Sequence, residues 1–368
     1  MKLHIFASSK INIIIMKQRT NKSKSKSSVR IIIFGALAII ILIVIVTIGT
    51  LYTKIVSPAF KTDKISELYI DETKDYEAIL SQLKIQSQIK DIRLFEQLAS
   101  YMKYPQNIKS GKYEIKPQMN YLELVRMLRN GNQVPVKFTF NNIRLKKDFA
   151  ERVGNQLMFD QEFLLDKLNN QAVCQSFGFD NNTIMCMFIP NTYEIYWTIS
   201  VTQFLERMKK EFDRFWTSER LNKARELSLS PMEVSILASI VEEETAAYSE
   251  YPIVAGLYIN RLRKGWLLQA DPTVKFAVGD FELRRILNFH LETDSPYNTY
   301  KNPGLPPGPI RIPSIAGIDA VLNYTHHNYL FMVAKEDFSG RHNFAVTLSE
   351  HNRFAEKYRT ALNRNNIR

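Results

Sequence analysis

The longest uninterrupted run of apolar residues covers residues 31–53, reads IIIFGALAIIILIVIVTIGTLYT and contains no charged side chain. A helix of about 20 apolar residues crosses the roughly 30 Å hydrocarbon core of a bilayer. A cleaved signal peptide has a shorter apolar region, about 7–15 residues, that ends in small residues. This run is longer and lacks such an exit, so it predicts an uncleaved transmembrane helix.

Short apolar patterns fill residues 66–133, after a polar stalk at residues 54–65. In chain order they predict a strand, two helices, a second strand and a further helix, at residues 68–70, 76–83, 92–102, 112–115 and 121–128. Strand, two helices, strand is the layout of a LysM-like βααβ module, a small fold used on N-acetyl sugars. We interpret residues 66–133 as such a module. The alternative is a spacer that holds the rest of the chain off the membrane.

Residues 134–368 combine strand and helix patterns and predict a second, mixed α+β domain. An alternating strand at 134–140 precedes amphipathic helices, which are expected at residues 145–170, 201–227, 252–264 and 347–362. The aromatic run FIPNTYEIYW at 188–197 is typical of an extended core segment. In the alternative interpretation, Tyr193, Tyr196 and Trp197 offer ring faces on which sugars stack.

A helix expected from residue 231 has a complete start signal: Ser230 as N-cap, a proline at the first position and Glu233 three residues after the cap. On a helical projection one stripe faces the core, made by Val234, Leu237, Ala238, Val241 and Thr245. Glu243 points the opposite way, into solvent. Glu242 and Glu244 lie on the two borders of the stripe, with Glu242 at the seam between core and groove.

The formal net charge of +12 is concentrated at the N-terminus. Residues 1–30 hold eight Lys and Arg and no acids, which leaves +4 for everything after them. A basic segment before an apolar span predicts a cytoplasmic tail at residues 1–30, with the rest of the chain outside the inner membrane. Because this location explains the charge, no nucleic-acid partner is expected. The basic segment MKQRTNKSKSKSS begins at Met16, which is therefore an alternative start to Met1.

The exported part contains two cysteines, Cys174 and Cys186. Export permits a disulfide between them, and two free, half-buried thiols are the alternative. No Cys/His cluster has zinc spacing, and no Gly-rich loop has phosphate-binding spacing. The adjacent His326 and His327 have no third ligand nearby in the sequence. We therefore expect neither a metal nor a cofactor.

Glu242 is the first candidate for acid–base chemistry. A carboxylic acid that donates a proton near neutral pH needs a raised pKa, and partial burial among apolar groups raises it. The border position of Glu242 meets this condition. By itself, however, a run of three glutamates on a helix is more typical of a solvated acidic face.

A stiff loop, SPYNTYKNPGLPPGPIRIP at residues 295–313, is the second candidate feature. It places Tyr297, Asn298, Thr299 and Tyr300 beside a Gly-Leu-Pro-Pro-Gly turn. Amides can bond sugar hydroxyls and aromatic rings can cover sugar faces, so such a loop suits carbohydrate. An ordinary proline-braced surface loop is the alternative.

Six motifs occur in one order along the chain: SIVEEET at 239–245, INRL at 259–262, LQADPTV at 268–274, YNTY at 297–300, GLPPGPI at 304–310 and GRHNF at 340–344. Together they resemble the MltG (YceG-like) endolytic murein transglycosylases, and the resemblance covers essentially the whole chain. The catalytic glutamate of that family is the first of its SIVE-x-ET motif, which corresponds to Glu242. The family's middle position is often Lys, whereas this chain has Glu243.

The resemblance implies a reaction at the bond between N-acetylmuramic acid and N-acetylglucosamine in peptidoglycan. Glu242 would protonate the bridging oxygen, and the sugar's own 6-hydroxyl would capture the cationic centre, giving a 1,6-anhydro end without water. We assign substrate positioning to the motif residues Gln269, Thr273, Tyr297, Asn298, Thr299, Tyr300 and His342. Asp271 is interpreted as an orienting residue, with a turn-capping aspartate as the alternative. For His342 the alternative is an ordinary strand residue.

Two other functions stay open at this point. A conventional hydrolase would use Asp271 as the partner of Glu242 and would leave reducing ends. A non-catalytic envelope scaffold would bind glycan through the LysM-like module and recruit synthases. The resemblance favours the transglycosylase, anchored in the inner membrane with its catalytic domain at 134–368 and expected to work beside peptidoglycan synthases as a terminator of nascent strands.

Overall fold

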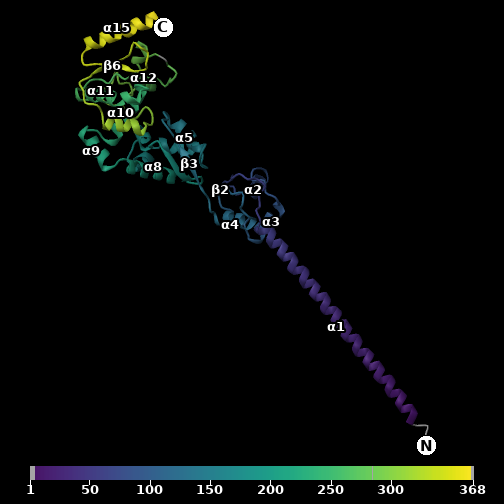
Figure 1. Ribbon diagram of the computed structural model, residues 1–368. Coiled ribbons are helices and arrows are strands. Elements are labelled where there is room, and N and C mark those ends of the chain that lie inside the picture. The colour runs from purple at the N-terminus through teal and green to yellow at the C-terminus, as the bar shows by residue number, and fades with distance from the viewer. Residues whose placement is uncertain (1–4, 284, 366–368) are drawn as a thin grey trace. The chain divides into compact units, whose positions relative to one another are not determined.

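The computed structural model describes residues 5–283 and 285–365, with side chains described from Val29 onward. The chain divides into two compact units, Met1–Gln133 and Val134–Arg368, and each is described by itself (Figure 1). Each unit has its own cluster of buried apolar side chains. The mixed α+β class with one N-terminal apolar helix is confirmed.

The first element is the long helix α1 (Ile5–Val56). Its stretch Val29–Val56 is long and apolar enough to cross a membrane, by length and composition, and none of it is buried against the protein. The span predicted at residues 31–53 lies inside this stretch. Residues 1–4 of the predicted basic tail lie outside the described residues.

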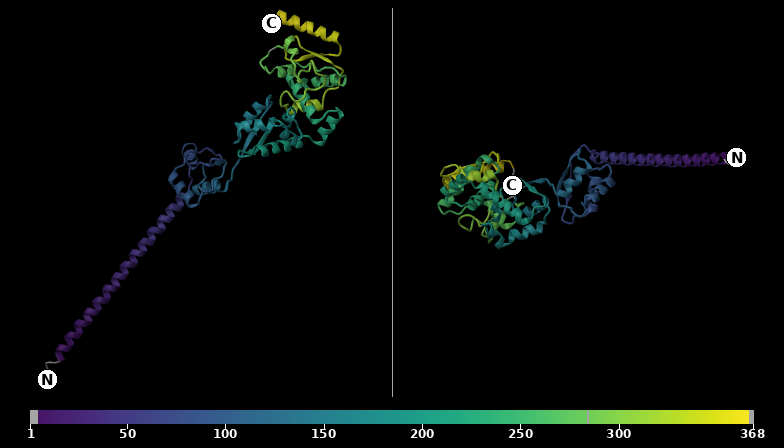
Figure 2. Two further views of the ribbon diagram at one scale, coloured as in Figure 1. Left: turned by 180° about the vertical axis from the view of Figure 1, so that it is seen from behind. Right: turned by 90° about the horizontal axis from the view of Figure 1, so that it is seen from below.

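The rest of the first unit is a small α+β body. Strands β1 (Ser66–Ile70) and β2 (Gly111–Ile115) pair antiparallel. Between and after them lie helices α2 (Tyr76–Ile85), α3 (Ile92–Tyr101) and α4 (Tyr121–Asn130), visible from further sides in Figure 2. Asp75, Asp91 and Asn120 cap these helices with their side chains. All five predicted elements are confirmed.

The second unit begins with a two-stranded sheet surrounded by helices. Strand β3 (Pro135–Thr139) pairs antiparallel with β4 (Thr192–Tyr196). The connecting and following helices are α5 (Lys146–Gly154), α6 (Gln161–Asn169), α7 (Gln171–Ser176), the short 3₁₀ helix η1 (Ile184–Met187), α8 (Val201–Phe215) and α9 (Ser218–Glu226). The expected extended segment and amphipathic helices are present, with α5 and α6 in the range 145–170 and α8 and α9 in the range 201–227.

The aromatic run around β4 is mainly core. Tyr193 is 6% exposed, donates its hydroxyl to the Ile189 carbonyl and stacks on Phe140. It therefore offers no free ring face to a sugar, and that alternative is wrong for this residue. Tyr196 lies on the opposite face of the strand and is 54% exposed.

The remaining elements build the part of the molecule that holds Glu242. They are α10 (Pro231–Glu244), η2 (Tyr248–Glu250), α11 (Tyr251–Arg263), α12 (Asp271–Val278), α13 (Asn288–Leu291), α14 (Ile315–Leu322), β5 (Phe331–Ala334), β6 (His342–Ala345) and α15 (Leu348–Arg364). Strands β5 and β6 pair antiparallel. Helices α11, α12 and α14 all pack against α10, so α10 is the central helix of this region.

The predicted single core stripe on α10 is wrong in one respect. Every residue from Val234 to Glu242 is buried, including Ser235 and Ser239, which share the polar border with Glu242. A helix covered by neighbours on all sides buries its polar border as well as its apolar stripe. Ser235 and Ser239 satisfy their hydroxyls by bonding back to carbonyls of the same helix, those of Pro231 and Ile236.

Both cysteines are buried free thiols, so the structure contains the alternative to the disulfide. The Cys174 sulfur lies 3.5 Å from the Leu168 carbonyl oxygen. The Cys186 sulfur lies 3.9 Å from the Met232 carbonyl oxygen. Burial raises the pKa of both thiols. They are therefore unreactive core residues in this fold.

Candidate active site

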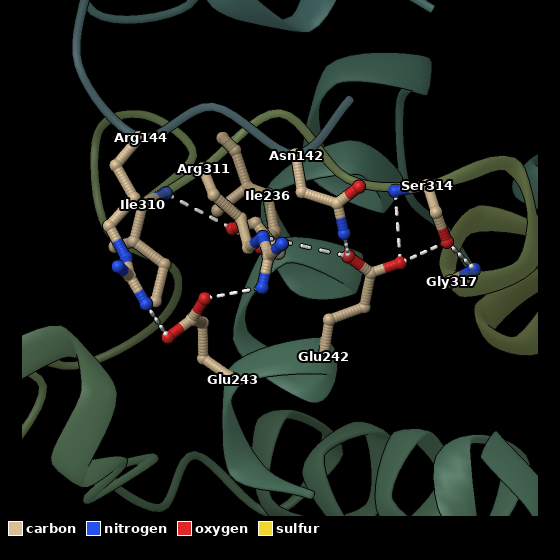
Figure 3. Close-up of polar contacts among 10 residues, drawn as sticks. Asn142, Arg144, Ile236, Glu242, Glu243, Ile310, Arg311, Ser314 and Gly317 are labelled. Atoms are coloured by element: carbon tan, nitrogen blue, oxygen red, sulfur yellow. Dashed lines mark hydrogen bonds and ion pairs between the residues drawn. The ribbon is translucent and has the colours of Figure 1, made fainter. Parts of the chain in front are cut away.

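Glu242 lies in the last turn of α10, and its side chain is 1% exposed. One carboxylate oxygen, Oε1, accepts a hydrogen bond from the Ser314 backbone N–H at 2.9 Å and a second from the Ser314 hydroxyl. Figure 3 shows both bonds converging on the same oxygen. Oε1 is thus fixed as an acceptor.

Ser314 has a second role as the N-cap of α14. Its hydroxyl accepts the Gly317 N–H at 3.0 Å, and its backbone is extended, as the cap position requires. Glu242 therefore lies at a helix N-terminus, where the helix dipole and free N–H groups favour a negative charge. A Cβ at Gly317 would lie 2.2 Å from Glu242 Oε1, so only glycine permits this approach.

The other oxygen, Oε2, has looser surroundings. The Asn142 side-chain amide lies 3.4 Å from it, and Arg311 Nε lies 3.8 Å from it. Since two good donors occupy Oε1 and only long contacts reach Oε2, a proton on this carboxyl resides on Oε2. Asn142 follows β3, and Arg311 lies in the segment between the Gly-Leu-Pro-Pro-Gly turn and α14 (Figure 3).

Glu243 does not point freely into solvent, so that prediction is wrong. Its side chain is 14% exposed and is held between two arginines. One oxygen is 2.7 Å from Arg144 Nη2 and the other is 2.5 Å from Arg311 Nη1. The helical projection failed here because segments far away in the sequence cover the outward face of the last turn of α10.

Burial raises the pKa of Glu242 above its usual value. The bonds from Ser314 and the charge of Arg311 oppose this effect, and the charge of Glu243 adds to it. The adjacent Tyr251 phenol has its pKa raised to about 12, first by burial and then by the charge of Glu242. Burial and the charge of Glu243 therefore favour the acid form of Glu242, whereas the Ser314 bonds and Arg311 favour its carboxylate form.

A polar pocket of about 240 Å³ lies on the other side of the end of α10. Glu244 and Asp271 both line it, and each accepts a tyrosine hydroxyl: Tyr258 to Glu244 at 2.5 Å and Tyr300 to Asp271 at 2.6 Å. Burial raises the pKa of Glu244 to about 7, and the neighbouring Asp271 contributes. A larger groove of about 1060 Å³ is lined by Glu243, Glu244 and Asp271 among others.

The YceG-like family matches the chain over residues 68–357, which include the first unit from β1 onward and most of the second unit. This match covers most of the chain. The protein belongs to the YceG-like family.

Two curated relatives have the same name. The endolytic murein transglycosylase of Bacillus subtilis (strain 168) is 27% identical over 331 residues, covering 85% of this chain and 91% of the relative. The endolytic murein transglycosylase of Streptococcus pneumoniae serotype 2 is 24% identical over 347 residues, and the match covers only 62% of that longer relative.

A solved crystal structure supports the fold. A YceG-like protein of Listeria monocytogenes is 26% identical and has a TM-score of 0.51, with 79% of this chain and 99% of that chain covered. The similarity therefore includes nearly all of the listerial structure.

The motif residues of this YceG-like chain divide into two groups by position. Gln269, Asp271, Tyr300 and His342 line the 240 Å³ pocket with Glu244. His342 also bonds Glu250, with Nδ1 2.9 Å from Oε2, and it is the first residue of β6. This group faces open space and remains a candidate substrate surface.

The second group, Thr273, Asn298 and Thr299, is fully buried or nearly so. The Thr273 and Thr299 hydroxyls bond each other at 2.8 Å, and the Asn298 amide donates to the carbonyls of Leu291 and Thr293. Their polar atoms are bonded inside the fold, which indicates that they hold the loop, and contact of these three residues with substrate stays a prediction. Tyr297 is half-buried against Phe276, with ring centroids 4.7 Å apart.

Sequence reasoning missed the residues that contact the Glu242 carboxyl: Asn142, Arg311, Ser314 and Gly317. One signal was present, because Ser314 directly precedes an apolar stretch and so reads as a helix cap. Nothing in the pattern indicates that this cap meets Glu242. Among the described residues no group of three or more His, Cys, Asp or Glu gathers as metal ligands.

Proposed function

We propose that this protein is a lytic transglycosylase that cleaves peptidoglycan glycan strands, with Glu242 as acid and then base. The observation that carries the proposal is the enclosed Glu242 carboxyl, which has one oxygen fixed by Ser314 and the other in loose contact. Membership of the YceG-like family and relatives named endolytic murein transglycosylases support the same substrate class.

The first step uses the proton on Oε2. Glu242 gives it to the oxygen that joins N-acetylmuramic acid to N-acetylglucosamine, and the bond from that oxygen to C1 breaks with its electron pair going to the oxygen. A carboxyl whose pKa is raised by burial is suited to this donation near neutral pH. Ser314 stabilises the carboxylate that remains, through charge-assisted hydrogen bonds.

The second step regenerates the acid. The 6-hydroxyl oxygen of the same muramyl residue bonds to C1, and its proton passes to the Glu242 carboxylate. The products are a free 4-hydroxyl on one fragment and a 1,6-anhydro end on the other. No water is consumed, and Glu242 returns to its protonated state.

The surroundings favour this one-carboxyl reaction over conventional hydrolysis. Hydrolysis needs a second carboxylate facing the scissile bond. Glu243 is paired with two arginines, and Glu244 is bonded to Tyr258. Asp271, the suspected partner, bonds Tyr300 and lines the pocket with Glu244 rather than contacting Glu242.

The direct test is Glu242→Gln in the full-length protein, assayed on purified glycan strands with product analysis by mass spectrometry. Glutamine keeps the shape and still accepts from Ser314, but its amide has no acidic proton to transfer. Because this change removes the general acid, we expect activity to fall by at least about 10²-fold. Glu226→Gln, on an exposed residue of α9, is the matched control and should cut as the wild type does.

The identity of the products decides between the alternatives. Anhydro-muramyl ends are expected from the wild type. Reducing ends would instead indicate the hydrolase, and full activity in Glu242→Gln would rule out the assignment of the acid.

We also propose that residues 66–133 form the LysM-like module that binds N-acetyl sugars. The order β1, α2, α3, β2 supports the proposal. The test is binding of the Glu242→Gln protein to immobilised glycan strands, compared with the same variant lacking residues 66–133. Equal retention of the two would favour the spacer.

The apolar part of α1 supports a further proposal about location. We propose a single-pass anchor in the inner membrane, with the N-terminus in the cytoplasm and the second unit outside. From there the enzyme would reach nascent strands beside peptidoglycan synthases and terminate their elongation.

A further inference from the structure

Arg311 is the cation that faces the Glu242 carboxyl. Its Nε is buried, has no hydrogen-bond partner and lies 3.8 Å from Glu242 Oε2. A buried donor without an acceptor is costly, so its presence needs an explanation. The separation is too long for a hydrogen bond and short enough that a small movement would make one.

The opposite edge of Arg311 is firmly held. Its Nη1 lies 2.5 Å from Glu243 Oε1, while Arg144 holds the other oxygen of Glu243 at 2.7 Å. A guanidinium is planar, so fixing one edge also fixes the direction of Nε–H. Glu243 and Arg144 therefore hold the unpaired donor in a constant direction, toward Glu242 (Figure 3).

We propose that Arg311, clamped by Glu243, is a positioning residue that bonds Glu242 Oε2 each time this oxygen loses its proton. The contact is long while Oε2 carries the proton, because two hydrogens would then face each other. It shortens when the proton has gone to the bridging oxygen, and lengthens again when the 6-hydroxyl returns a proton. This inference rests on the proposed acid–base role of Glu242.

The other groups around Glu242 do not duplicate this effect. Ser314 and Asn142 are uncharged, and the Tyr251 phenol, with its pKa raised to about 12, stays neutral near neutral pH. Glu243 is negative and acts in the opposite direction. Arg144 is positive, but its ion pair is with Glu243.

The test is the pH dependence of kcat/KM for the full-length protein in detergent. Because the reaction starts from protonated Glu242, kcat/KM falls as the pH rises through the pKa of this group. Loss of Arg311 in Arg311→Gln favours the protonated form of Glu242. The alkaline limb of the profile, where kcat/KM falls, should therefore move to higher pH by about one pH unit. The value of kcat should also fall, since the carboxylate is less stabilised. Arg311→Lys keeps the charge, so its alkaline limb should lie close to that of the wild type.

Arg144→Gln is the matched control, because it removes the same charge from the same glutamate without facing Glu242. Its limb should move clearly less than that of Arg311→Gln. Melting temperatures show whether each variant folds, and Arg311→Met, which keeps the stem, replaces Arg311→Gln if the latter does not.

An unmoved limb in a folded Arg311 variant would overturn the inference, as would an equal movement in Arg144→Gln. Loss of activity at every pH without a limb shift would indicate a purely structural role and would overturn it too. Failure of the proposed function looks different: the wild type would leave no anhydro ends, or Glu242→Gln would stay active.

Discussion

At the scale of single residues, three consecutive glutamates of α10 have three different environments. Glu242 is fixed by Ser314, Glu243 is paired with two arginines, and Glu244 accepts the Tyr258 hydroxyl. Neighbours along a helix face different directions, so each meets a different part of the fold. The three carboxyl groups therefore have three different sets of partners within one turn.

Glu244 makes stability depend on pH. Its pKa in the folded protein is about 7, above the ordinary value of 4.5, so the folded state holds the proton more tightly. This contribution is complete below about pH 4.5 and is lost as the pH rises toward 7.

Glu244→Gln should remove this dependence, because glutamine stays neutral and still accepts from Tyr258. Between pH 5 and pH 8 the wild type should lose on the order of 2 kcal/mol of unfolding free energy relative to the variant, after allowing for partial solvent contact. Denaturant titrations of both proteins at the two pH values measure it. Parallel losses in wild type and variant would exclude Glu244 as the source.

The sequence selected Glu242 through its motif rather than through its geometry. The helical projection treated α10 as half exposed, and it therefore misplaced Glu243. The spacing of apolar residues shows which face of a helix is apolar, but it does not show which other segments pack on the helix. Contacts from Asn142, Arg311 and Ser314 join positions 69 or more residues away from Glu242, which no local pattern contains.

At the scale of elements, α14 is the helix whose placement defines the site. It is eight residues long, is capped by Ser314 and presents Gly317 directly to the Glu242 carboxyl. Its own cap residue also fixes Oε1. The Ser314 side chain therefore both caps α14 and fixes the position of the Glu242 carboxyl.

Gly317→Ala should damage activity more than stability. Alanine favours the helix, but its Cβ would lie 2.2 Å from Oε1 and would displace the carboxyl. A displacement of about 1 Å lowers the rate on the order of 10²-fold. Ala316→Gly, at the adjacent exposed position, is the control, since it changes helix propensity without touching Glu242. Rates on glycan strands and melting temperatures should be compared; near-normal cleavage by Gly317→Ala would contradict the described packing.

The helices of residues 66–133 were predictable, and the short helices of the site were not. Helices α2, α3 and α4 agree with the pattern because each has 10 residues and a side-chain N-cap. Helices α12, α13 and α14 have four to eight residues, too few to show a period.

At the scale of the whole molecule, the described residues contain one helix apolar enough to cross a membrane, and it begins the first of two compact units. This helix was predictable from the sequence because a bilayer requires about 20 consecutive apolar residues in a helix that crosses it. The chain forms two units because the apolar residues of each unit pack into a separate buried core. The polar network around Glu242 has no comparable signature in the sequence.

The proposed orientation predicts a labelling pattern. A cysteine introduced as Ser57→Cys, after the apolar stretch, should react with a membrane-impermeant maleimide on intact spheroplasts. Ser27→Cys, before the stretch, should react only after lysis. The native thiols are buried and give a low background. Labelling of Ser27→Cys on intact cells would reverse the proposed topology.

The wide spacing of the residues around Glu242 has a consequence for the timing of synthesis. Asn142 is 100 positions before Glu242, and Ser314 is 72 positions after it. Contacts of such separation form only when the intervening chain is available and folded. In the proposed orientation, a chain still crossing the membrane therefore has no assembled acid, and the enzyme stays inactive until its own delivery is nearly complete.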